Sequence, residues 1–539
     1  MNPGGEIIDR FNLGKLPVGY SYGRKDGQLL YFNEPTPAAE NKKGYAGLAA
    51  QPNILTTSGL YNAPVQVAVE VPQGVAAYYT TDGSEPNQES PRYTGPVMLS
   101  KMAGEEMPEG NVFRVRGYSD GMLPSAVSTG NYFIDSRHTL PIVALSTAPA
   151  NMYDPKIGIY VRGDGERANY AQEWERPVNF QLFDTDGRLL IDTDACFRVF
   201  GAYSRAEREQ KGLAVIARGE YGDNRLRFPL FESRPYEEYK SVVLRASGMD
   251  STVTKVRDML ATSIAGDGGI LAVQAYKQCV LYINGEYFGV YNLREKVTKY
   301  FLEQHYGVNP ENLDFLVGSG TSSGSVLQGD TKEYKALLAY LESHALSDAE
   351  NYAYIEERID VDNFIDWLFA EMYFMNTDTG NIKYFRERRE GSKWRWIFYD
   401  LDWGFAGSSR NPFEYWLDPQ GHGGSSKMFS TLLERKMFES PVFREKFLER
   451  AAYLLKNVYT SEKVLARMDE LVGNIESEMQ RDAKRWPQGN GFNVWQSNVK
   501  STRTFCEKRT DYMIYHVRKQ FGVSESEAQN LFGSLGMAP

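Results

Sequence analysis

The chain has 539 residues, with 60 Lys or Arg and 70 Asp or Glu, so its formal charge at pH 7 is −10. This length exceeds one ordinary hydrophobic core, and we expect two to four domains. The acidic balance, without any Lys/Arg-rich run, argues against nucleic acid as a partner. No apolar run reaches the roughly 18 to 20 residues of a transmembrane helix, and the first residues lack the apolar segment of a signal peptide.

Residues 1–135 consist of short alternating segments separated by Gly, Pro and Asn, a pattern typical of an all-β region. The runs at 66–71 and 75–80 are examples. The second run leads into Thr-Asp-Gly-Ser at 81–84, where the Asp-Gly pair suits the positive-φ positions of a tight turn. We therefore interpret Asp82 as a turn residue and not as a ligand.

The pattern changes beyond residue 140. Strands at 177–183 and 195–200 alternate with loops and precede an amphipathic helix at 254–265, which predicts an α+β region. Arg205 follows one strand, and Lys211 opens the next apolar strand. A lysine there could neutralise phosphate, although such a lysine considered alone is more often a solvated residue at a strand edge.

A hairpin is predicted around Asn284-Gly285, which separates two β-prone runs. The second run leads to Glu295, at the junction with a predicted helix at 297–306. An acid at this junction either favours the helix N-terminus through the helix dipole or pairs with a buried lysine across the site. Both interpretations remain open from the residues alone.

The second half of the chain is predominantly helical. The Gly/Ser-rich stretch 318–325 lacks the Gly-Lys-Ser/Thr ending of a P-loop and is interpreted as a mobile linker. Residues 347–350 fit a capping box at the start of a helix. The apolar periodicity predicts helices at 332–346, 362–374, 428–438, 442–455, 461–484 and 498–520.

Two short strand-like runs, 382–386 and 394–399, are separated by the turn residues Glu390-Gly391-Ser392, which predicts a second hairpin. Pairing these strands would bring the polar residues before the first strand beside those after the second. The polar residues are Asp378, Asn381, Asp400 and Asp402. Oxygen ligands of this kind suit Mg²⁺, and one acid would be left to orient a nucleophile. The alternative is a structural role, in turn capping or in salt bridges to Arg386 or Lys383.

Other metal and nucleophile chemistries find no support. The five histidines show no ligand spacing, which argues against a zinc hydrolase. No Gly-x-Ser-x-Gly motif of a serine esterase is present. Cys196, Cys279 and Cys506 are distant from one another and odd in number, which indicates neither a disulfide framework nor a Cys-x-x-Cys metal site.

Four motifs together resemble the spore-coat protein H (CotH) kinase family. They are the segment 198–211, Asn-Gly-x-Tyr-x-Gly-x-Tyr-x-x-x-Glu at 284–295, Asn-x-Asp-x-x-Asn at 376–381, and Asp-x-Asp-x-x-Phe at 400–405. The resemblance covers about 140–520 and rests on their order and spacing. It implies an atypical, protein-kinase-like enzyme that transfers phosphate from ATP to Ser or Thr of a protein substrate with Mg²⁺.

The resemblance also implies roles for individual residues. Asp378 would be the catalytic acid that orients the acceptor hydroxyl. Mg²⁺ would bind Asn381 and Asp400, with Asp402 as a further metal ligand. The ATP phosphates would be held by an ion pair between Lys211 and Glu295, with Arg205 as a further cofactor-binding residue.

One spacing departs from the kinase pattern. Kinase catalytic loops place the metal-binding Asn about five residues after the catalytic Asp, whereas Asn381 follows Asp378 by three positions. A catalytically inactive kinase-like surface or adhesion protein, which binds glycans or envelope components through its β modules, therefore remains the alternative. Glycoside hydrolysis by paired acids has less support, because no second Asp or Glu partner is identifiable.

The N-terminal region carries two further resemblances. Residues 20–27 and 35–41 resemble the closing strands of a lamin-tail domain, and 58–118 resemble the immunoglobulin-like module at the end of chitobiases and hexosaminidases. We expect a partial lamin-tail-like segment at 1–52, the module at 53–135 and the CotH kinase-like domain at 136–539. Its β-rich lobe would span about 136–315 and its helical lobe about 330–539.

The expected fold class is thus multidomain. An N-terminal all-β part with an immunoglobulin-like sandwich is followed by an α+β, atypical protein-kinase-like domain with a helical C-terminal lobe. The resemblances imply an extracytoplasmic protein, secreted or at a bacterial surface, with a protein substrate and a possible glycan or envelope ligand.

Overall fold

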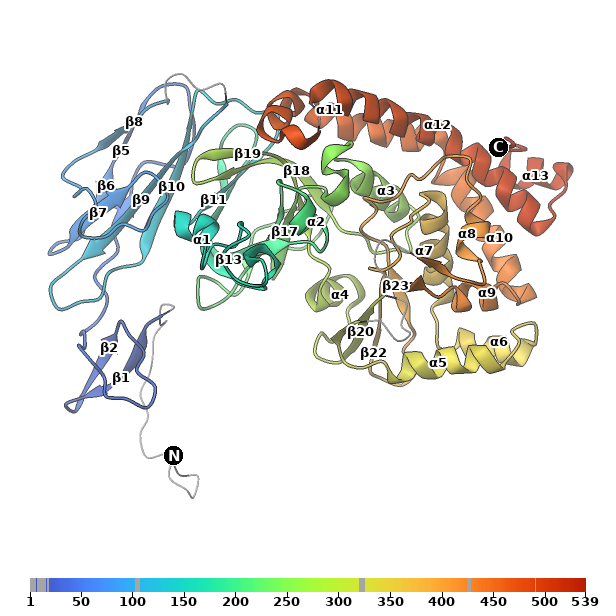
Figure 1. Ribbon diagram of the computed structural model, residues 1–539, viewed down its shortest axis with the longest axis horizontal. Coiled ribbons are helices and arrows are strands. Elements are labelled where there is room, and N and C mark those ends of the chain that lie inside the picture. Colours follow the sequence, from blue (N-terminus) through green and yellow to red (C-terminus); the bar gives the residue numbers. More distant parts are fainter. Residues whose placement is uncertain are drawn as a thin grey trace.

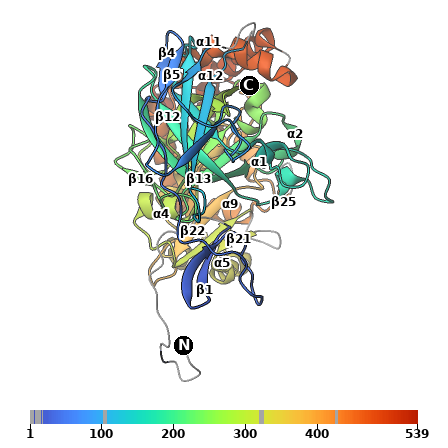
Figure 2. The same cartoon turned by 90° about the vertical axis from the view of Figure 1, so that its left-hand side faces the viewer.

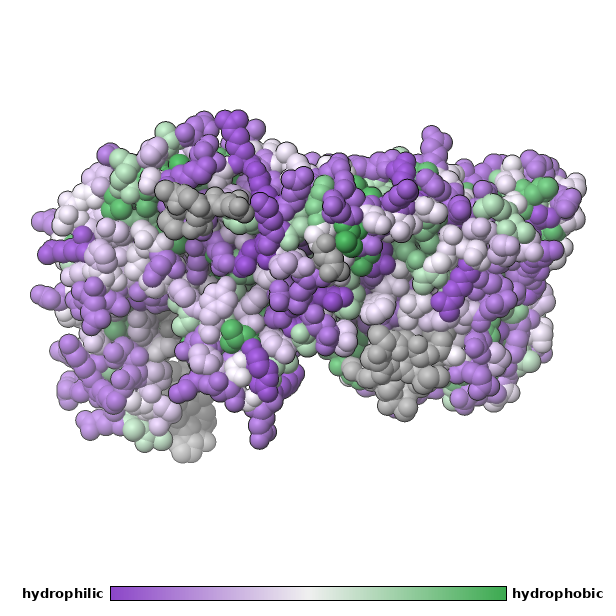
Figure 3. Space-filling model, turned by 45° about the horizontal axis from the view of Figure 1, so that its top comes forward, coloured by the Kyte–Doolittle hydropathy of each residue, from purple (hydrophilic) through white to green (hydrophobic). Residues whose placement is uncertain are grey.

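The computed structural model describes residues 6, 16, 19–101, 107–318, 325–423, 428–489 and 491–539. The β-rich N-terminal parts lie at one end of the molecule and the helix-rich C-terminal part at the other, with a barrel between them (Figure 1). The face seen in Figure 3 is largely hydrophilic, and its apolar residues form small separate groups. The apolar side chains are instead gathered in internal cores.

The N-terminal region is all-β, as predicted. A hairpin of β1 (Ser21–Lys25) and β2 (Gln28–Phe32) lies below the sheets of the next module (Figure 1, Figure 2). That module has a four-stranded sheet in the order β4-β10-β9-β7 and two strand pairs, β3-β6 and β5-β8. Its core includes Val67, Phe113 and Tyr132. The strands are β3 (Asn53–Ile54), β4 (Gly59–Tyr61), β5 (Val65–Val67), β6 (Val69–Glu70), β7 (Ala76–Thr80), β8 (Val97–Leu99), β9 (Asn111–Tyr118) and β10 (Val127–Ile134).

A closed barrel follows, in the order β11-β12-β13-β14-β17-β19-β18. It closes because β11 pairs with β18 in parallel, and its interior is filled by buried apolar side chains such as Phe180, Val215 and Leu281. The strands are β11 (Ile142–Ser146), β12 (Arg176–Phe183), β13 (Leu189–Phe200), β14 (Gly212–Ile216), β17 (Ser241–Arg245), β18 (Tyr276–Ile283) and β19 (Glu286–Glu295). Between them lie α1 (Pro149–Tyr153), η1 (Asn169–Ala171), α2 (Ser204–Glu207), β15 (Leu226–Arg227), β16 (Glu238–Tyr239), η2 (Gly248–Thr252) and α3 (Arg257–Gly266).

The C-terminal part combines a second sheet with helices. The sheet has the order β21-β20-β22-β23 and consists of β20 (Leu313–Val317), β21 (Ser325–Gln328), β22 (Lys383–Glu387) and β23 (Arg395–Ile397). The helices and short elements are α4 (Lys299–Tyr306), α5 (Lys332–Ser343), α6 (Ala349–Glu356), α7 (Val361–Tyr373), α8 (Pro412–Trp416), β24 (His422–Gly423), β25 (Met428–Phe429), α9 (Leu432–Met437), α10 (Pro441–Asn457), α11 (Ser461–Arg485), η3 (Pro487–Gly489), α12 (Phe492–Phe521) and α13 (Glu525–Phe532). Helix α7 is central, since every one of its residues except Asp362 is buried.

Several boundaries differ from those predicted. The helix expected at 428–438 is wrong at its start, because Met428–Phe429 forms strand β25 and the helix begins at Leu432. The capping box expected at 347–350 is wrong, because the N-cap is Asp348, whose side chain accepts from the backbone N–H groups of Glu350 and Asn351. The predicted linker 318–325 lies largely outside the described residues.

The β module is docked directly on the barrel. At the tip of the β18–β19 hairpin, Gly285 O accepts a hydrogen bond from Gly110 N at 2.8 Å. Asn131 Nδ2 of the module donates to Gln181 Oε1 of β12 at 3.0 Å, in a buried position. A Cβ on Gly83 would overlap Asn284, so the Asp-Gly turn lies against the same hairpin tip. The turn interpretation of Asp82 agrees with this, since its side chain accepts from Ser84 N at 2.9 Å.

Candidate functional site

The hairpin predicted at 382–399 is confirmed, with β22 and β23 antiparallel and Lys383 opposite Ile397. Beside its paired ends, Asn381 Nδ2 donates to Asp400 Oδ2 at 2.6 Å and to Asp378 Oδ2 at 3.4 Å. The amide of Asn381 therefore joins the two carboxylates. The structure brings these three side chains together as the hairpin prediction required.

Helix α7 leads into this cluster through a buried carboxyl group. Glu371 is 1% exposed, and its Oε2 accepts from Asn376 Nδ2 at 2.8 Å. Asn376 Oδ1 in turn accepts from the backbone N–H of Asp378 at 3.0 Å. Burial, with the nearby charges of Asp378 and Asp400, raises the pKa of Glu371 to about 8. At neutral pH Glu371 is therefore mainly a neutral acid that anchors the loop of Asp378.

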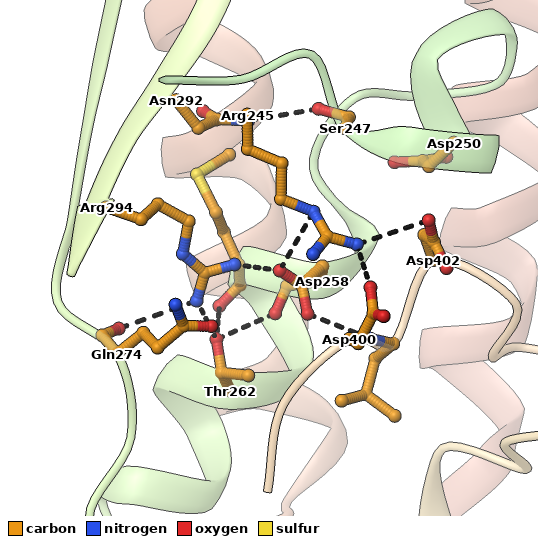
Figure 4. A network of polar contacts seen from close by, with 12 residues as sticks. Arg245, Ser247, Asp250, Asp258, Thr262, Gln274, Asn292, Arg294, Asp400 and Asp402 are labelled. Atoms are coloured by element: carbon orange, nitrogen blue, oxygen red, sulfur yellow. Dashed lines mark hydrogen bonds and ion pairs between the residues drawn. The ribbon is translucent and has the colours of Figure 1, made fainter. Parts of the chain in front are cut away.

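An arginine that the sequence analysis missed lies among the acids. Arg245, the last residue of β17, contacts Asp400 Oδ1 through Nη2, and the same nitrogen lies 3.2 Å from Asp402 Oδ2 (Figure 4). Burial alone would lower the pKa of Arg245, but Asp400 and Asp402 raise it. In the sequence, Arg245 could have been recognised as the charged residue that ends the otherwise apolar strand 242–245.

The two aspartates differ in their protonation. The Asp402 side chain is 8% exposed, and burial together with the charge of Asp400 raises its pKa to about 7. Burial would also raise the pKa of Asp400, but Arg245 and then Lys383 bring it below its usual range. Like charges in one site push their pKa values apart. At neutral pH Asp400 is therefore ionised, while Asp402 is partly protonated.

Two residues near the acids have backbone conformations with positive φ. Asp400 adopts a left-handed conformation with φ of 69°, and Gly248 has φ of 56°. Asp402 Oδ2 accepts from Met249 N at 2.9 Å, and a Cβ on Gly248 would overlap that same oxygen. A side chain at 248 is thus disfavoured by both the conformation and the close approach of Asp402.

Asp258 of α3 anchors the acidic segment to the rest of the fold. Its Oδ1 accepts from Leu401 N at 2.8 Å, and its Oδ2 contacts the buried Arg294 of β19 (Figure 4). The segment that carries Asp400 and Asp402 is therefore held by barrel and helix together.

A row of cations extends from Asp400 along the barrel. Lys383 Nζ lies 4.4 Å from the centroid of the Tyr399 ring, and burial followed by the charge of Lys296 lowers its pKa to about 8. Burial and the neighbouring Arg198 likewise lower the pKa of Lys296 to about 8. Lys296 thus lies close enough to lower the pKa of Lys383, and Arg198 close enough to lower that of Lys296, so positive charge accumulates in the row and an anion would be stabilised there.

The expected ion pair between Lys211 and Glu295 is not formed. Lys211 Nζ donates to Arg208 O at 2.7 Å and lies 4.8 Å from the centroid of the Tyr170 ring. Glu295 instead contacts His305 Nε2 at 3.0 Å and Arg234 Nε at 3.2 Å.

The strand register explains why. Val242 of β17 pairs with both Val215 of β14 and Glu295 of β19. Lys211 precedes Val215 by four positions, which corresponds to about 13 Å along the strand. It also lies two strands away, so the two side chains are at opposite ends of the sheet.

Arg205 lies at the outer end of the row of cations. Its Nη1 is 3.4 Å from Glu173 Oε1, and the same carboxylate contacts Arg198. Arg205 is thus held beside Arg198 and is not held by the acids of the cluster.

The donor set can be compared with the needs of a metal ion. Within the described part of the chain, no three or more His, Cys, Asp or Glu side chains are grouped so that they could hold a metal. Mg²⁺ does not require such a group, because it keeps several waters and is bound by one or two carboxylates plus substrate phosphates. The carboxylates of Asp400 and Asp402 and the amide of Asn381 fit that requirement.

Comparison with known proteins identifies the larger part of the chain. The sequence model of the CotH kinase protein family matches residues 197–513. The chain belongs to the CotH kinase family. The match includes the four polar residues at the hairpin, Arg245 and the row of cations. The chain is therefore a kinase-like protein, in which a β-rich N-terminal region precedes a C-terminal CotH domain that contains helices.

A second match lies in the β module. The chitobiase/beta-hexosaminidase C-terminal domain matches residues 56–105, in agreement with the resemblance of the Thr-Asp-Gly-Ser turn. No curated protein matched the CotH chain. Among the described helices, none has the length and apolar character needed to cross a membrane.

Proposed function

We propose that this CotH protein transfers the γ-phosphate of ATP to a Ser or Thr hydroxyl of a protein substrate, with Mg²⁺ as cofactor. The observation that carries the proposal is the amide of Asn381, which joins Asp378 to Asp400 at one end of a hairpin. Phosphoryl transfer needs this arrangement, with one acid that orients the acceptor and others that hold the metal.

In this proposal the acids have separate roles. Asp378, held through Asn376 and Glu371, orients the acceptor hydroxyl and accepts its proton. Asp400, Asp402 and Asn381 hold the metal, whose bound form supplies charge neutralisation at the phosphates. The largely buried position of Asp402 keeps its carboxylate fixed while the half-buried Asp400 faces the nucleotide.

The nucleotide phosphates bind the row of cations. Lys383 and Lys296 replace the expected pair of Lys211 and Glu295 in this role. Both lysines have lowered pKa values because they are buried near other cations, and an incoming phosphate would raise these pKa values again. Lys383 is also the first residue of β22, two positions after Asn381.

The domain organisation belongs to the same proposal. The β-rich lobe at about 136–315 and the helical lobe at about 330–539 form a kinase-like pair, and residues 53–135 form an immunoglobulin-like sandwich. The hairpin before it is the end of a lamin-tail-like segment. The CotH and chitobiase-type matches favour an extracytoplasmic location, where the docked module would orient the kinase on an envelope component.

A non-enzymatic surface protein is the second candidate. Two observations favour it, namely the short spacing from Asp378 to Asn381 and the guanidinium of Arg245 between the acids. In that case the fold would serve as a scaffold and the β modules would bind the ligand.

Labelled ATP distinguishes the two candidates. The full chain is incubated with γ-labelled ATP and Mg²⁺, with and without a generic acceptor protein, and compared with Asp378→Asn and Asp400→Asn. We expect transfer by the wild type and a loss of at least about 100-fold in each variant. Asp330→Asn is the matched control, since Asp330 pairs with Arg388 at the surface. Absence of nucleotide binding and transfer at millimolar ATP would leave the scaffold candidate.

A further inference from the structure

Arg245 occupies the space between the two acids that are proposed to hold the cation. Its side chain is 11% exposed, and Nη2 contacts Asp400 and Asp402 together (Figure 4). The guanidinium therefore acts as the counter-ion of the acid pair.

Three of the four carboxylate oxygens of the two acids are already engaged while Arg245 stays there. Asp400 Oδ1 contacts Arg245, and Asp400 Oδ2 accepts from Asn381 Nδ2 at 2.6 Å. Asp402 Oδ2 accepts from Met249 N at 2.9 Å and also faces Arg245. Both oxygens of Asp400 are engaged, so a divalent cation that binds this carboxylate competes with an N–H donor already in contact.

The rest of the site holds Arg245 weakly. Its Nε has no hydrogen-bond partner within the described residues and lies 3.7 Å from Asp258 Oδ2. That carboxylate is already engaged by Arg294 and by Leu401 N. A guanidinium that gives up Asp400 and Asp402 thus needs a new anion, because a buried unpaired charge is costly.

We propose that Arg245 competes with the divalent cation for Asp400 and Asp402 and moves to a nucleotide phosphate when the cation binds. This inference rests on the proposed function. It explains how binding of the divalent cation is coupled to binding of the nucleotide. Without nucleotide, Arg245 disfavours the bare cation by occupying its ligands. With nucleotide, the displaced guanidinium gains a phosphate partner, and arginine binds phosphate oxygens well.

The competition predicts opposite effects on the two ligands. Removal of the guanidinium charge frees Asp400 and Asp402 and strengthens binding of the bare cation. The same change removes a phosphate contact and weakens binding of nucleotide. A general loss of structure would weaken binding of both ligands. Stronger binding of the cation together with weaker binding of nucleotide therefore identifies the competition.

Mn²⁺ without nucleotide is the direct probe, measured by its electron paramagnetic resonance signal in titrations of the full chain. We expect Arg245→Met to bind Mn²⁺ at least about tenfold more tightly than the wild type, because a positive charge next to the ion is gone. Arg245→Lys keeps a charge and should show a smaller gain. Arg450→Gln, which breaks the distant pair with Asp366, should leave the affinity unchanged.

The second measurement is the affinity for a fluorescent ATP analogue, which should fall about tenfold in Arg245→Met. Equal or weaker Mn²⁺ binding by Arg245→Met would overturn the competition while leaving the metal site intact. Absence of Mn²⁺ binding in every variant would overturn the metal site itself and the inference with it.

A crystal structure of the wild type with Mn²⁺ keeps the test independent of the stability of the variant. Arg245 should have left Asp400 in that structure. A bound Mn²⁺ with Arg245 still in contact with both acids would refute the inference.

Discussion

Asn381 Nδ2 lies 2.6 Å from Asp400 Oδ2, although 19 positions separate the two residues. Their contact follows from the antiparallel pairing of β22 with β23, which places the start of one strand beside the end of the other. The same amide reaches Asp378, so it links the proposed catalytic acid to the proposed metal ligand.

Replacement of Asn381 should therefore impair catalysis more than folding. We expect Asn381→Ala to lower phosphate transfer at least about tenfold, since the metal and Asp378 lose their common partner. The rate of transfer from labelled ATP is the measurement. Asn457→Ala is the control, because the Asn457 side chain donates to Tyr453 O at the surface of α10. Equal rates in the two variants would contradict the role of Asn381.

Substitution of Lys383 should weaken nucleotide binding, whereas substitution of Lys211 should not. Lys383 lies beside Asp400 and Lys296, whereas Lys211 packs against tyrosine rings at the far end of the sheet. We expect Lys383→Gln to weaken binding of an ATP analogue about tenfold, because a charged phosphate contact is lost. Lys211→Gln should bind like the wild type in the same fluorescence titration. The reverse order would reinstate Lys211 as the phosphate-binding lysine.

A side chain at position 248 is predicted to destabilise the protein. In Gly248→Ala the methyl group would overlap Asp402 Oδ2 in a backbone conformation with φ of 56°. We expect a loss of about 1 to 3 kcal/mol in the free energy of unfolding, together with weaker binding of Mn²⁺. Denaturant titration measures the first effect. Gly95→Ala, where no atom lies within 4 Å of the added Cβ, should change neither quantity.

Glu434 should make stability depend on pH. Its side chain is buried, its Oε2 has no hydrogen-bond partner among the described residues, and burial raises its pKa from 4.5 to about 8. Below pH 4.5 the carboxyl group is neutral in both the folded and the unfolded states, so its ionisation does not change the free energy of unfolding. Between pH 4.5 and 8 only the unfolded state releases the proton, so stability falls as pH rises and is level above 8.

The variant Glu434→Gln removes this dependence. One pKa unit corresponds to about 1.4 kcal/mol, so the variant should gain as much as roughly 4 kcal/mol of stability at pH 8 relative to its gain at pH 4.5. Denaturant titrations across this pH range check the slope. Glu439→Gln, which alters a partly exposed carboxylate, serves as the control. Parallel curves for Glu434→Gln and the wild type would contradict the prediction.

The docked module should unfold together with the barrel. Asn131 Nδ2 donates to Gln181 Oε1 at 3.0 Å and to Ser146 Oγ at 3.1 Å in the buried interface. Asn131→Ala leaves these groups without their partner, at a cost of about 1 to 3 kcal/mol. Calorimetry should show one transition for this pair of domains in the wild type and a separate, earlier one for the module in the variant. Gln66→Ala, on an exposed position of β5, should behave like the wild type.

Local sequence patterns determined the elements that carry the site. Asn284-Gly285 and Gly391 each placed a hairpin, because their turn conformations are local properties of the chain. The apolar periodicity of 362–374 identified α7, and the hairpin then brought Asp378, Asn381 and Asp400 together without any further information.

Only the tertiary structure decided the counter-charges of this CotH protein. Arg245 and Asp400 are 155 positions apart, and their contact depends on how the barrel closes and which face of β17 meets the β22–β23 hairpin. The failure of Lys211 to meet Glu295 has the same origin, since strand order and register place them at opposite ends of one sheet. Charge attraction acts between any opposite pair, so the sequence names candidates for an ion pair but the register of distant strands selects which of them meet.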